Sequence, residues 1–252
     1  MKILMMIIRW QGGHGTVALG LKKELESRGH IVEIISREDD KLSKLDLRKF
    51  VRNYGKYYDI IYTYDWSMAL PLLFPYPIHF NKHYCLFHGH QPNKLRFLQS
   101  IIGKCMGKKL FVVGDTLKER FPNSTLVYNG VDFDTFKDLK KKRECIGWIK
   151  RDYDLISEEG FFKLAQLYNL IPIIADHIPF EKMNEFYNRC KMFVSYPPDY
   201  TGFNLAWIEA KAAGVPTIMG NNNGIGVANA VENYKSFTWK KNVDKLLEVW
   251  ND

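Results

Sequence analysis

Short apolar segments, each followed by a helical pattern, constrain this chain more than any other feature of its sequence. In the first half they cover residues 2–9, 30–36, 59–65, 84–88 and 109–114, and Gly, Pro or polar turns bound them. A strand that is apolar along its whole length is buried on both faces, and the intervening helices supply that cover. The sequence therefore predicts an α/β protein with parallel sheets.

The alternation pauses near Asn129, passes through a lysine-rich stretch at 137–144 and then resumes. Further strands are expected at 145–149, 171–176, 192–196 and 216–219, and the last two helices at 224–234 and 243–250. We therefore expect two doubly wound, Rossmann-like lobes, 1–132 and 133–252. Ligands of such sheets bind at the carboxyl ends of the strands, which places the expected site in a cleft between the lobes.

Composition limits the class of protein. Hydrophobic residues make up 46% of the 252 residues and charged residues 25%, the balance of a chain that buries a core rather than of a disordered one. No apolar run approaches the roughly 18 residues that cross a bilayer, and the first run is typical of a buried strand instead of a signal peptide. Four scattered cysteines without metal-ligand spacing are typical of a reducing cytoplasm.

The net charge of +8 favours an anionic partner, which would be nucleic acid, membrane lipid or a phosphorylated small molecule. No nucleic-acid-binding module is recognisable, so we expect no nucleic-acid partner. A basic helix is predicted over 41–54, with the apolar positions Leu42, Leu45, Phe50 and Tyr54 flanked by Lys41, Lys44, Arg48 and Arg52. Such a helix suits peripheral contact with an anionic membrane, and a merely solvated basic face fits equally well.

A glycine-rich loop, Gly12-Gly13-His14-Gly15, separates the first strand from the first helix. Glycines let backbone N–H groups approach a phosphate, and the start of a helix adds partial positive charge there. A tight strand-to-helix turn without any ligand has the same composition. The loop alone therefore leaves anion binding and a plain turn open.

The stretch from Tyr196 to Pro216 has the second informative pattern. A strand ends at a Pro pair, and a helix is expected to begin near Thr201 as its N-cap, leaving the N–H groups of 202–205 free. Glu209 then falls about two turns into the helix. Its carboxylate can accept two hydroxyl hydrogen bonds there, although an ordinary helix with a surface glutamate has the same sequence.

This stretch resembles the signature of retaining glycosyltransferases with the GT-B fold, of the family 4 type. That signature reads Glu-Gly-Phe-Gly-Leu, three further residues, Glu-Ala, and then Gly-Val-Pro before a strand. Residues 26–32, which end in Gly-His-Ile-Val, resemble the end of the family's first helix and its second strand. Residues 128–136, with Asn-Gly-Val-Asp, resemble its hinge motif. The blocks follow the family's order over nearly the whole chain.

The resemblance implies transfer of a sugar from a nucleotide-diphosphate-sugar to an acceptor hydroxyl, with retention and without a metal or other cofactor. The acceptor would be a sugar or a lipid-linked molecule, at the cytoplasmic face of a membrane in the second case. By this resemblance the donor-binding residues are Gly12, Gly13, Asp199, Thr201, Gly202, Phe203, Asn204, Leu205 and Glu209, the last on the donor ribose. His14 and Asp65 are assigned to the acceptor, and His88, Lys150 and Arg151 to catalysis.

His88 matches the family's His-Gly pair at the end of a strand in the first lobe. A histidine there can hydrogen-bond a sugar hydroxyl or phosphate, and we expect it to titrate near neutral pH. A structural histidine is the alternative. Asp65, at the end of the strand before it, is expected either to bind the acceptor or only to cap a helix.

Some positions depart from the family pattern. Thr201 stands where the family has the first Glu of its carboxylate pair, and Asp199 lies two residues earlier. Gly147-Trp148 and Glu159-Gly160 stand where the family has the Arg and the Lys that face the donor diphosphate. We expect Lys150 and Arg151 to supply this charge. The alternative is a catalytically degenerate protein that keeps the fold and binds nucleotide or glycan without turnover.

Overall fold

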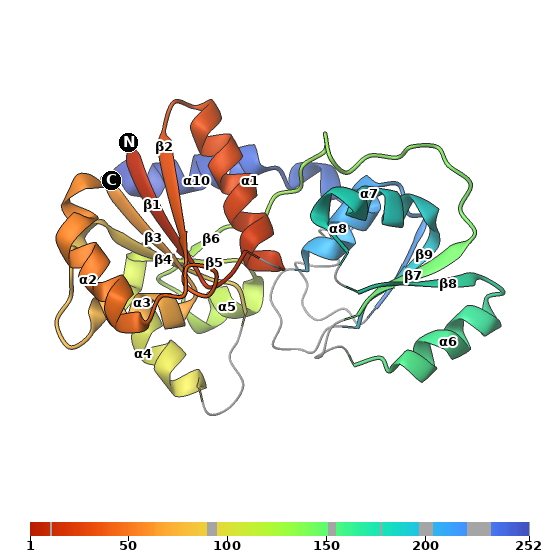
Figure 1. Ribbon diagram of the computed structural model, residues 1–252, viewed down its shortest axis with the longest axis horizontal. Coiled ribbons are helices and arrows are strands. Elements are labelled where there is room, and N and C mark those ends of the chain that lie inside the picture. Colours follow the sequence, from red (N-terminus) through yellow and green to blue (C-terminus); the bar gives the residue numbers. More distant parts are fainter. Residues whose placement is uncertain are drawn as a thin grey trace. The chain divides into compact units, whose positions relative to one another are not determined.

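The computed structural model describes residues 1–10, 12–89, 95–150, 155–176, 178–196, 204–220 and 233–251. The chain divides into two compact units (Figure 1). Unit 1 comprises Met1–Gly130 together with Trp239–Asp252, and unit 2 comprises Val131–Thr238. Each unit is a parallel sheet covered by helices, so the predicted fold class is confirmed.

Unit 1 is built on a six-stranded sheet of order β2-β1-β3-β4-β5-β6. Its strands are β1 (Lys2–Ile7), β2 (Ile31–Ser36), β3 (Ile60–Tyr64), β4 (His83–Phe87), β5 (Leu110–Val112) and β6 (Thr125–Leu126). All neighbours pair in parallel. Residues Ile3–Ile7 of β1 have no exposed surface, as expected of a strand that is covered on both faces.

Helices cover both faces of this sheet. Leu4, Met6 and Ile61 pack with α2 (Lys44–Tyr54) and α3 (Trp66–Leu73). On the same side, α4 (Arg96–Met106) and α5 (Asp115–Arg120) cover β4 and β5. The opposite face lies under α1 (Gly13–Ser27) and α10 (Trp239–Asn251), which pack on each other (Figure 1).

The last helix corrects the expected division of the chain, because α10 belongs to unit 1 and not to the lobe 133–252. The Trp239 ring lies against Gly20 of α1, where a Cβ would come within 2.2 Å of it. The Trp250 ring contacts Tyr62 and Tyr84, with centroids 5.5 and 6.1 Å away. The helix itself was predicted. Its amphipathic spacing shows that one face is buried, but not against which sheet.

Unit 2 has a four-stranded parallel sheet of order β10-β9-β7-β8. Its strands are β7 (Cys145–Ile149), β8 (Ile171–Ala175), β9 (Cys190–Val194) and β10 (Thr217–Met219), with helices α6 (Glu158–Leu167), α7 (Phe180–Arg189) and α8 (Leu205–Ala212). The expected helix at 224–234 falls almost wholly outside the described residues. At its end, Tyr234–Ser236 forms a short 3-10 turn.

Arg143, just before β7, joins the ends of two helices of unit 2. Its guanidinium donates hydrogen bonds to the carbonyl oxygens of Tyr187 and Cys190 at the end of α7, and of Ala213 after α8. It also lies 2.9 Å from the carboxylate of Asp138. A cation at helix C-termini matches the partial negative charge of their free carbonyls. Arg143 thus fixes α7 and α8 relative to the start of the central strand.

The expected apolar stripe of α2 is wrong in register. Leu45 and Tyr54 are 60% and 51% exposed, whereas Leu47, Arg48 and Val51 are buried. The Arg48 guanidinium turns inward and donates to the carbonyl oxygens of Pro71, Phe74 and Tyr76, at 2.6, 2.8 and 2.8 Å. Arg48 is therefore a structural residue that holds the turn after α3, and not a surface charge.

We expect Arg48→Met to lower the free energy of unfolding by about 3 kcal/mol, because the three carbonyls lose a charged donor. Urea unfolding followed by circular dichroism measures this. Arg52→Met is the matched control on the same helix. Since Arg52 is exposed, we expect this substitution to change stability by less than about 0.5 kcal/mol. Equal effects of the two substitutions would contradict a structural role for Arg48.

Candidate functional site: polar groups at the strand ends

The carboxyl ends of β1, β3 and β4 bring together the sequence-predicted residues of unit 1. The chain runs from β1 to β2 on one side and then crosses to β3 on the other. Loops diverge at such a switch point and leave a crevice for ligands. His14 follows β1, Asp65 follows β3, and His88 follows β4.

The glycine loop has defined backbone requirements. Gly12 is the N-cap of α1 with a φ of 77°, in the left-handed region that favours glycine. A Cβ on Gly15 would lie 1.7 Å from the carbonyl oxygen of Trp10, so only glycine fits there. Gly12 and Gly13 are exposed, and a Cβ on either would meet open space. The tight turn is therefore real, and it leaves these two residues open to a ligand.

His14 and His88 lie side by side, with ring centroids 4.8 Å apart. The ring of Tyr64, the last residue of β3, stacks on His88 at 5.5 Å. The Nε2 atom of His88 is buried and has no hydrogen-bond partner among the described residues. A buried polar atom of this kind is usually matched by a ligand or water. Sequence reasoning did not assign Tyr64 to the site, although it adjoins Asp65.

Both imidazoles are neutral at physiological pH. Burial and the positive charge of Arg9 lower the pKa of His14 to about 4. Burial and the neighbouring His14 hold the pKa of His88 well below its usual 6.5. The expectation that His88 titrates near neutrality is therefore wrong, because its surroundings are too dry for the charged form. His88 can exchange hydrogen bonds with a ligand, but it carries no charge to the site.

Asp65 is the N-cap of α3, which is one of the two roles expected for it. Its Oδ1 accepts a hydrogen bond of 2.7 Å from the N–H of Trp66, and its backbone has a φ of 71°. Burial raises the pKa of the Asp65 carboxyl from the ordinary 3.8 to about 6. A positive φ at a non-glycine residue is strained and is often found at functional sites. The role in acceptor binding stays a prediction.

Asp65→Asn should change how stability depends on pH. The carboxyl pKa is raised on folding, so the folded state binds a proton more tightly than the unfolded state does. The free energy of unfolding therefore falls as the pH rises from about 4 to 6. Asparagine keeps an acceptor for the Trp66 N–H and removes this fall. We expect the variant to match the parent near pH 4 and to exceed it by roughly 3 kcal/mol at pH 7.

Urea unfolding between pH 4 and 7 measures the effect, with the exposed Asp134→Asn as control. Parallel stability curves for the parent and Asp65→Asn would show that burial does not perturb Asp65.

Unit 2 has its own switch point, between β7 and β9. Lys150 follows β7, and Ser195 follows β9. The Ser195 hydroxyl accepts a hydrogen bond of 3.0 Å from the side-chain amide of Asn204. Asn204 is the N-cap of α8, and its Oδ1 accepts from the N–H of Ala206.

The helix therefore begins at Leu205 with Asn204 as its cap, which corrects the expected start at Thr201. Asn and Thr are both good caps, so composition alone could not decide the starting residue. The predicted residues Arg151, Asp199, Thr201, Gly202 and Phe203 lie outside the described residues.

Glu209 of α8 is buried, with 8% of its surface exposed, and its Oε2 accepts a hydrogen bond of 3.0 Å from the Tyr187 hydroxyl. Tyr187 lies on α7, where its ring packs edge-on against Phe136 and Phe193. Glu209 is therefore not an ordinary surface glutamate. Sequence reasoning missed Tyr187, because pairing between helices leaves no signal in a single sequence.

Lys150 is exposed, and its ammonium forms an ion pair of 2.8 Å with Glu158 at the start of α6. To pair with a leaving diphosphate, the ammonium of Lys150 would have to give up its ion pair with Glu158. The assigned catalytic role of Lys150 thus has a competitor within the chain, one that the sequence did not suggest.

The described part of the chain holds no candidate metal cluster, membrane-spanning helix or disulfide. It contains no group of three His, Cys, Asp or Glu side chains placed to hold a metal ion. Its helices include none with the length and hydropathy to cross a membrane. The four cysteines, Cys85, Cys105, Cys145 and Cys190, are free.

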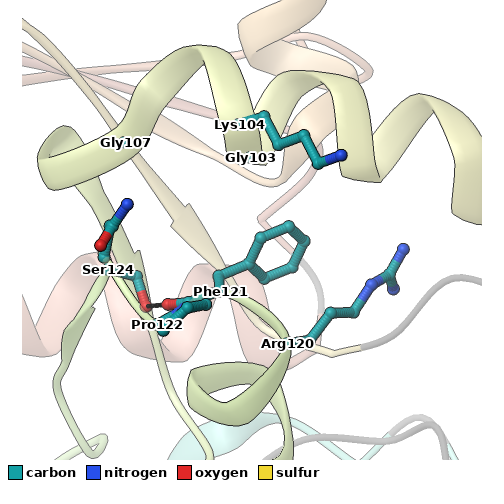
Figure 2. Close-up of a pocket in the computed structure, with 8 residues that line it drawn as sticks. Gly103, Lys104, Gly107, Arg120, Phe121, Pro122 and Ser124 are labelled. Atoms are coloured by element: carbon teal, nitrogen blue, oxygen red, sulfur yellow. Dashed lines mark hydrogen bonds between the residues drawn. The ribbon is translucent and has the colours of Figure 1, made fainter.

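A cavity of about 260 Å³ lies between α4 and the segment after α5 (Figure 2). Its lining includes Gly107 and Ser124, which come shortly before β5 and β6, so it lies at the edge opposite the strand-end groups. The Arg120 guanidinium at its rim already donates to Gln99 and Ser100. This cavity is thus separate from the predicted site residues.

Comparison with known proteins identifies the fold. No protein-family model matches the chain, and no curated protein sequence matches it. Among solved structures, AviGT4, a glycosyltransferase involved in avilamycin A biosynthesis, has a TM-score of 0.65 at 10% identity, over 99% of this chain and 97% of AviGT4.

Two further structures agree. Anabaena HepE in complex with UDP and glucose has a TM-score of 0.57 at 12% identity, over 98% of this chain and 94% of HepE. An α-glucosyltransferase in complex with UDP and a 13-mer DNA has a TM-score of 0.56 at 12% identity, over 96% of this chain and 84% of the α-glucosyltransferase. These likenesses show the fold, which is that of GT-B glycosyltransferases.

Proposed function

We propose that this protein is a glycosyltransferase that moves a sugar from a nucleotide-diphosphate-sugar to an acceptor hydroxyl, with retention and without a metal ion. The observation that carries the proposal is Glu209, a buried carboxylate held by Tyr187 in the segment that resembles the donor signature. The fold supports it, and so does the gathering of predicted residues at the switch point of each sheet.

In this proposal the donor lies on unit 2 and the acceptor on unit 1. The carboxylate of Glu209 accepts the ribose hydroxyls, and the backbone at the start of α8 lies beside the diphosphate. Lys150 and Arg151 stabilise the negative charge that grows on the leaving group. Neutral His88 hydrogen-bonds the transferred sugar, while His14 and Asp65 contact the acceptor.

The second candidate is a degenerate protein that binds nucleotide or glycan without turnover. The ion pair between Lys150 and Glu158 favours it, because the charge proposed for the leaving group is already matched. Absence of the family's first Glu at Thr201 points the same way.

A screen of nucleotide-sugars separates the two candidates. A donor at 100 times its Kd should add about 2.7 kcal/mol to the free energy of unfolding, which thermal shift detects. Release of nucleoside diphosphate then reports turnover, a chelator tests independence of metals, and NMR of the product gives its anomeric configuration. With sugar acceptors supplied, stabilisation without release of diphosphate supports the degenerate protein. No stabilisation by any nucleotide contradicts the glycosyltransferase and leaves only a degenerate protein that binds glycan.

Glu209→Gln should weaken binding of the matching ribonucleoside diphosphate by roughly 1–3 kcal/mol, since an amide accepts a ribose hydroxyl less strongly than a carboxylate does. Calorimetric titration measures this. The 2′,3′-dideoxy nucleotide should bind the parent and the variant equally. Glu185→Gln, an exposed change on α7, is the control. Unchanged affinity in Glu209→Gln would remove the assignment of Glu209 to the ribose.

Tyr187→Phe tests whether Tyr187 positions Glu209. The ring keeps its contacts with Phe136 and Phe193, but the bond to Glu209 is lost. We expect a loss of about 1 kcal/mol in ribonucleotide affinity, and none for the dideoxy nucleotide. In the background of Glu209→Gln the added loss should shrink, because the two groups act together. Equal losses for both nucleotides would indicate a general structural effect instead.

We also propose that the protein works in the cytoplasm. Four free cysteines, three of them buried, support a reducing setting.

A further inference from the structure

The exposed side of α2 and the turn after α3 form one surface that the proposed reaction does not use. The carbonyls of Phe74 and Tyr76 accept hydrogen bonds from Arg48, which holds this turn beside α2. Along α2 and into the following 3-10 turn, positions 45, 49, 52 and 56 are spaced by four, three and four residues and so form one stripe next to Arg48. We name this the basic-aromatic surface, made of Leu45, Lys49, Arg52, Lys56, Phe74 and Tyr76.

Its apolar members are unusually accessible. Leu45 is 60% exposed, Phe74 43% and Tyr76 76%. The ammonium of Lys56 lies 5.0 Å from the ring centre of Tyr57, which is itself exposed. Single apolar side chains at a surface are normal. Here they gather beside three cations, which is the composition of a binding surface.

The three cations of this surface keep a net positive charge, with Asp46 as the one acidic residue on the same helix. No ion pair to Lys49, Arg52 or Lys56 is present in the part of the chain that the structure describes. Asp46 bonds to Ser43 in the capping box. It lies one turn before Lys49, and its bonds to Ser43 together with the charge of Lys49 lower the pKa of its carboxyl, but the side chains of Asp46 and Lys49 form no ion pair. In unit 2, by contrast, Lys140, Lys142 and Lys163 all pair with carboxylates.

We propose that the basic-aromatic surface docks on an anionic lipid bilayer. Lysine and arginine are attracted to the negative potential of such a bilayer, and aromatic rings settle at the level of its headgroups. Leu45 and Phe74 offer nothing polar to a nucleic acid, but both leave water on entering a headgroup region. The surface thus combines charge complementarity with apolar groups at the same place.

The direct test is sedimentation with vesicles of phosphatidylglycerol and phosphatidylcholine, against vesicles of phosphatidylcholine alone. The full chain should pellet with the anionic vesicles and not with the neutral ones, and binding should weaken as salt increases. Equal pelleting with both kinds, or with neither, would overturn the proposal.

Variants locate the contact. Lys49→Gln, Arg52→Gln and Lys56→Gln together should lower partitioning on the order of 100-fold, at about five-fold for each cation. The control carries the same loss of charge on unit 2, at the exposed Lys182, Lys191 and Lys235, each changed to Gln. Equal losses in the two triple variants would show a net-charge effect and not a surface, which contradicts the proposal.

The apolar contribution is tested without any change of charge, by Phe74→Ser with Tyr76→Ser. This pair should weaken vesicle binding more than it lowers thermal stability, since Tyr76 is 76% and Phe74 43% exposed. A duplex oligonucleotide is included as competitor. If it displaces the vesicles and its binding survives the serine pair, the partner is nucleic acid and the membrane proposal fails.

The result is independent of the proposed reaction. Nucleotide binding by the triple variant should equal that of the parent, because none of the three cations lies at the carboxyl end of a strand of either sheet. Loss of vesicle binding with nucleotide binding intact therefore tests the surface alone.

Discussion

Burial of β1 on both faces is the constraint on which the rest of unit 1 depends. Its residues Ile3–Ile7 are fully enclosed, so helices have to cover both sides of the sheet, and the chain has to cross from one side to the other. Crossing creates the switch point between β1 and β3, and the switch point puts His14, Asp65 and His88 at one edge. The polar groups are thus gathered by a requirement of the core.

Burial at this edge also sets the protonation of His14, Asp65 and His88. Burial lowers the pKa of His14 and His88 and raises that of Asp65, so all three favour their uncharged forms more than they would in water. Neutral histidines suit recognition of hydroxyl groups by hydrogen bonds, while Asp65, with a pKa of about 6, is mostly ionised at pH 7 and accepts from them. The two neutral histidines bring no positive charge to hold an anion, and in the proposed function the diphosphate lies on unit 2.

Much of the fold could be predicted because strand and helix patterns are local. The expected strand at 145–149 matches β7, and that at 171–176 matches β8 to within one residue. What failed depends on partners far away in the chain. The period of α2 placed Arg48 beside an apolar stripe, but only the carbonyls that follow α3 explain why it turns inward. Tyr187 became part of the site only through its bond to a helix some twenty residues later. Glu209 was found because its motif is local.

The return of α10 to unit 1 has a consequence for how the chain is made. During synthesis from the N-terminus, unit 2 is complete before the last helix of unit 1 exists. Until then Tyr62 and Tyr84 lack the Trp250 ring that packs on them, and this aromatic part of the sheet stays open to water. Unit 1 is therefore the first to be synthesised and the last to complete its fold. Its uncovered face needs protection from aggregation while the ribosome adds the more than one hundred residues of unit 2.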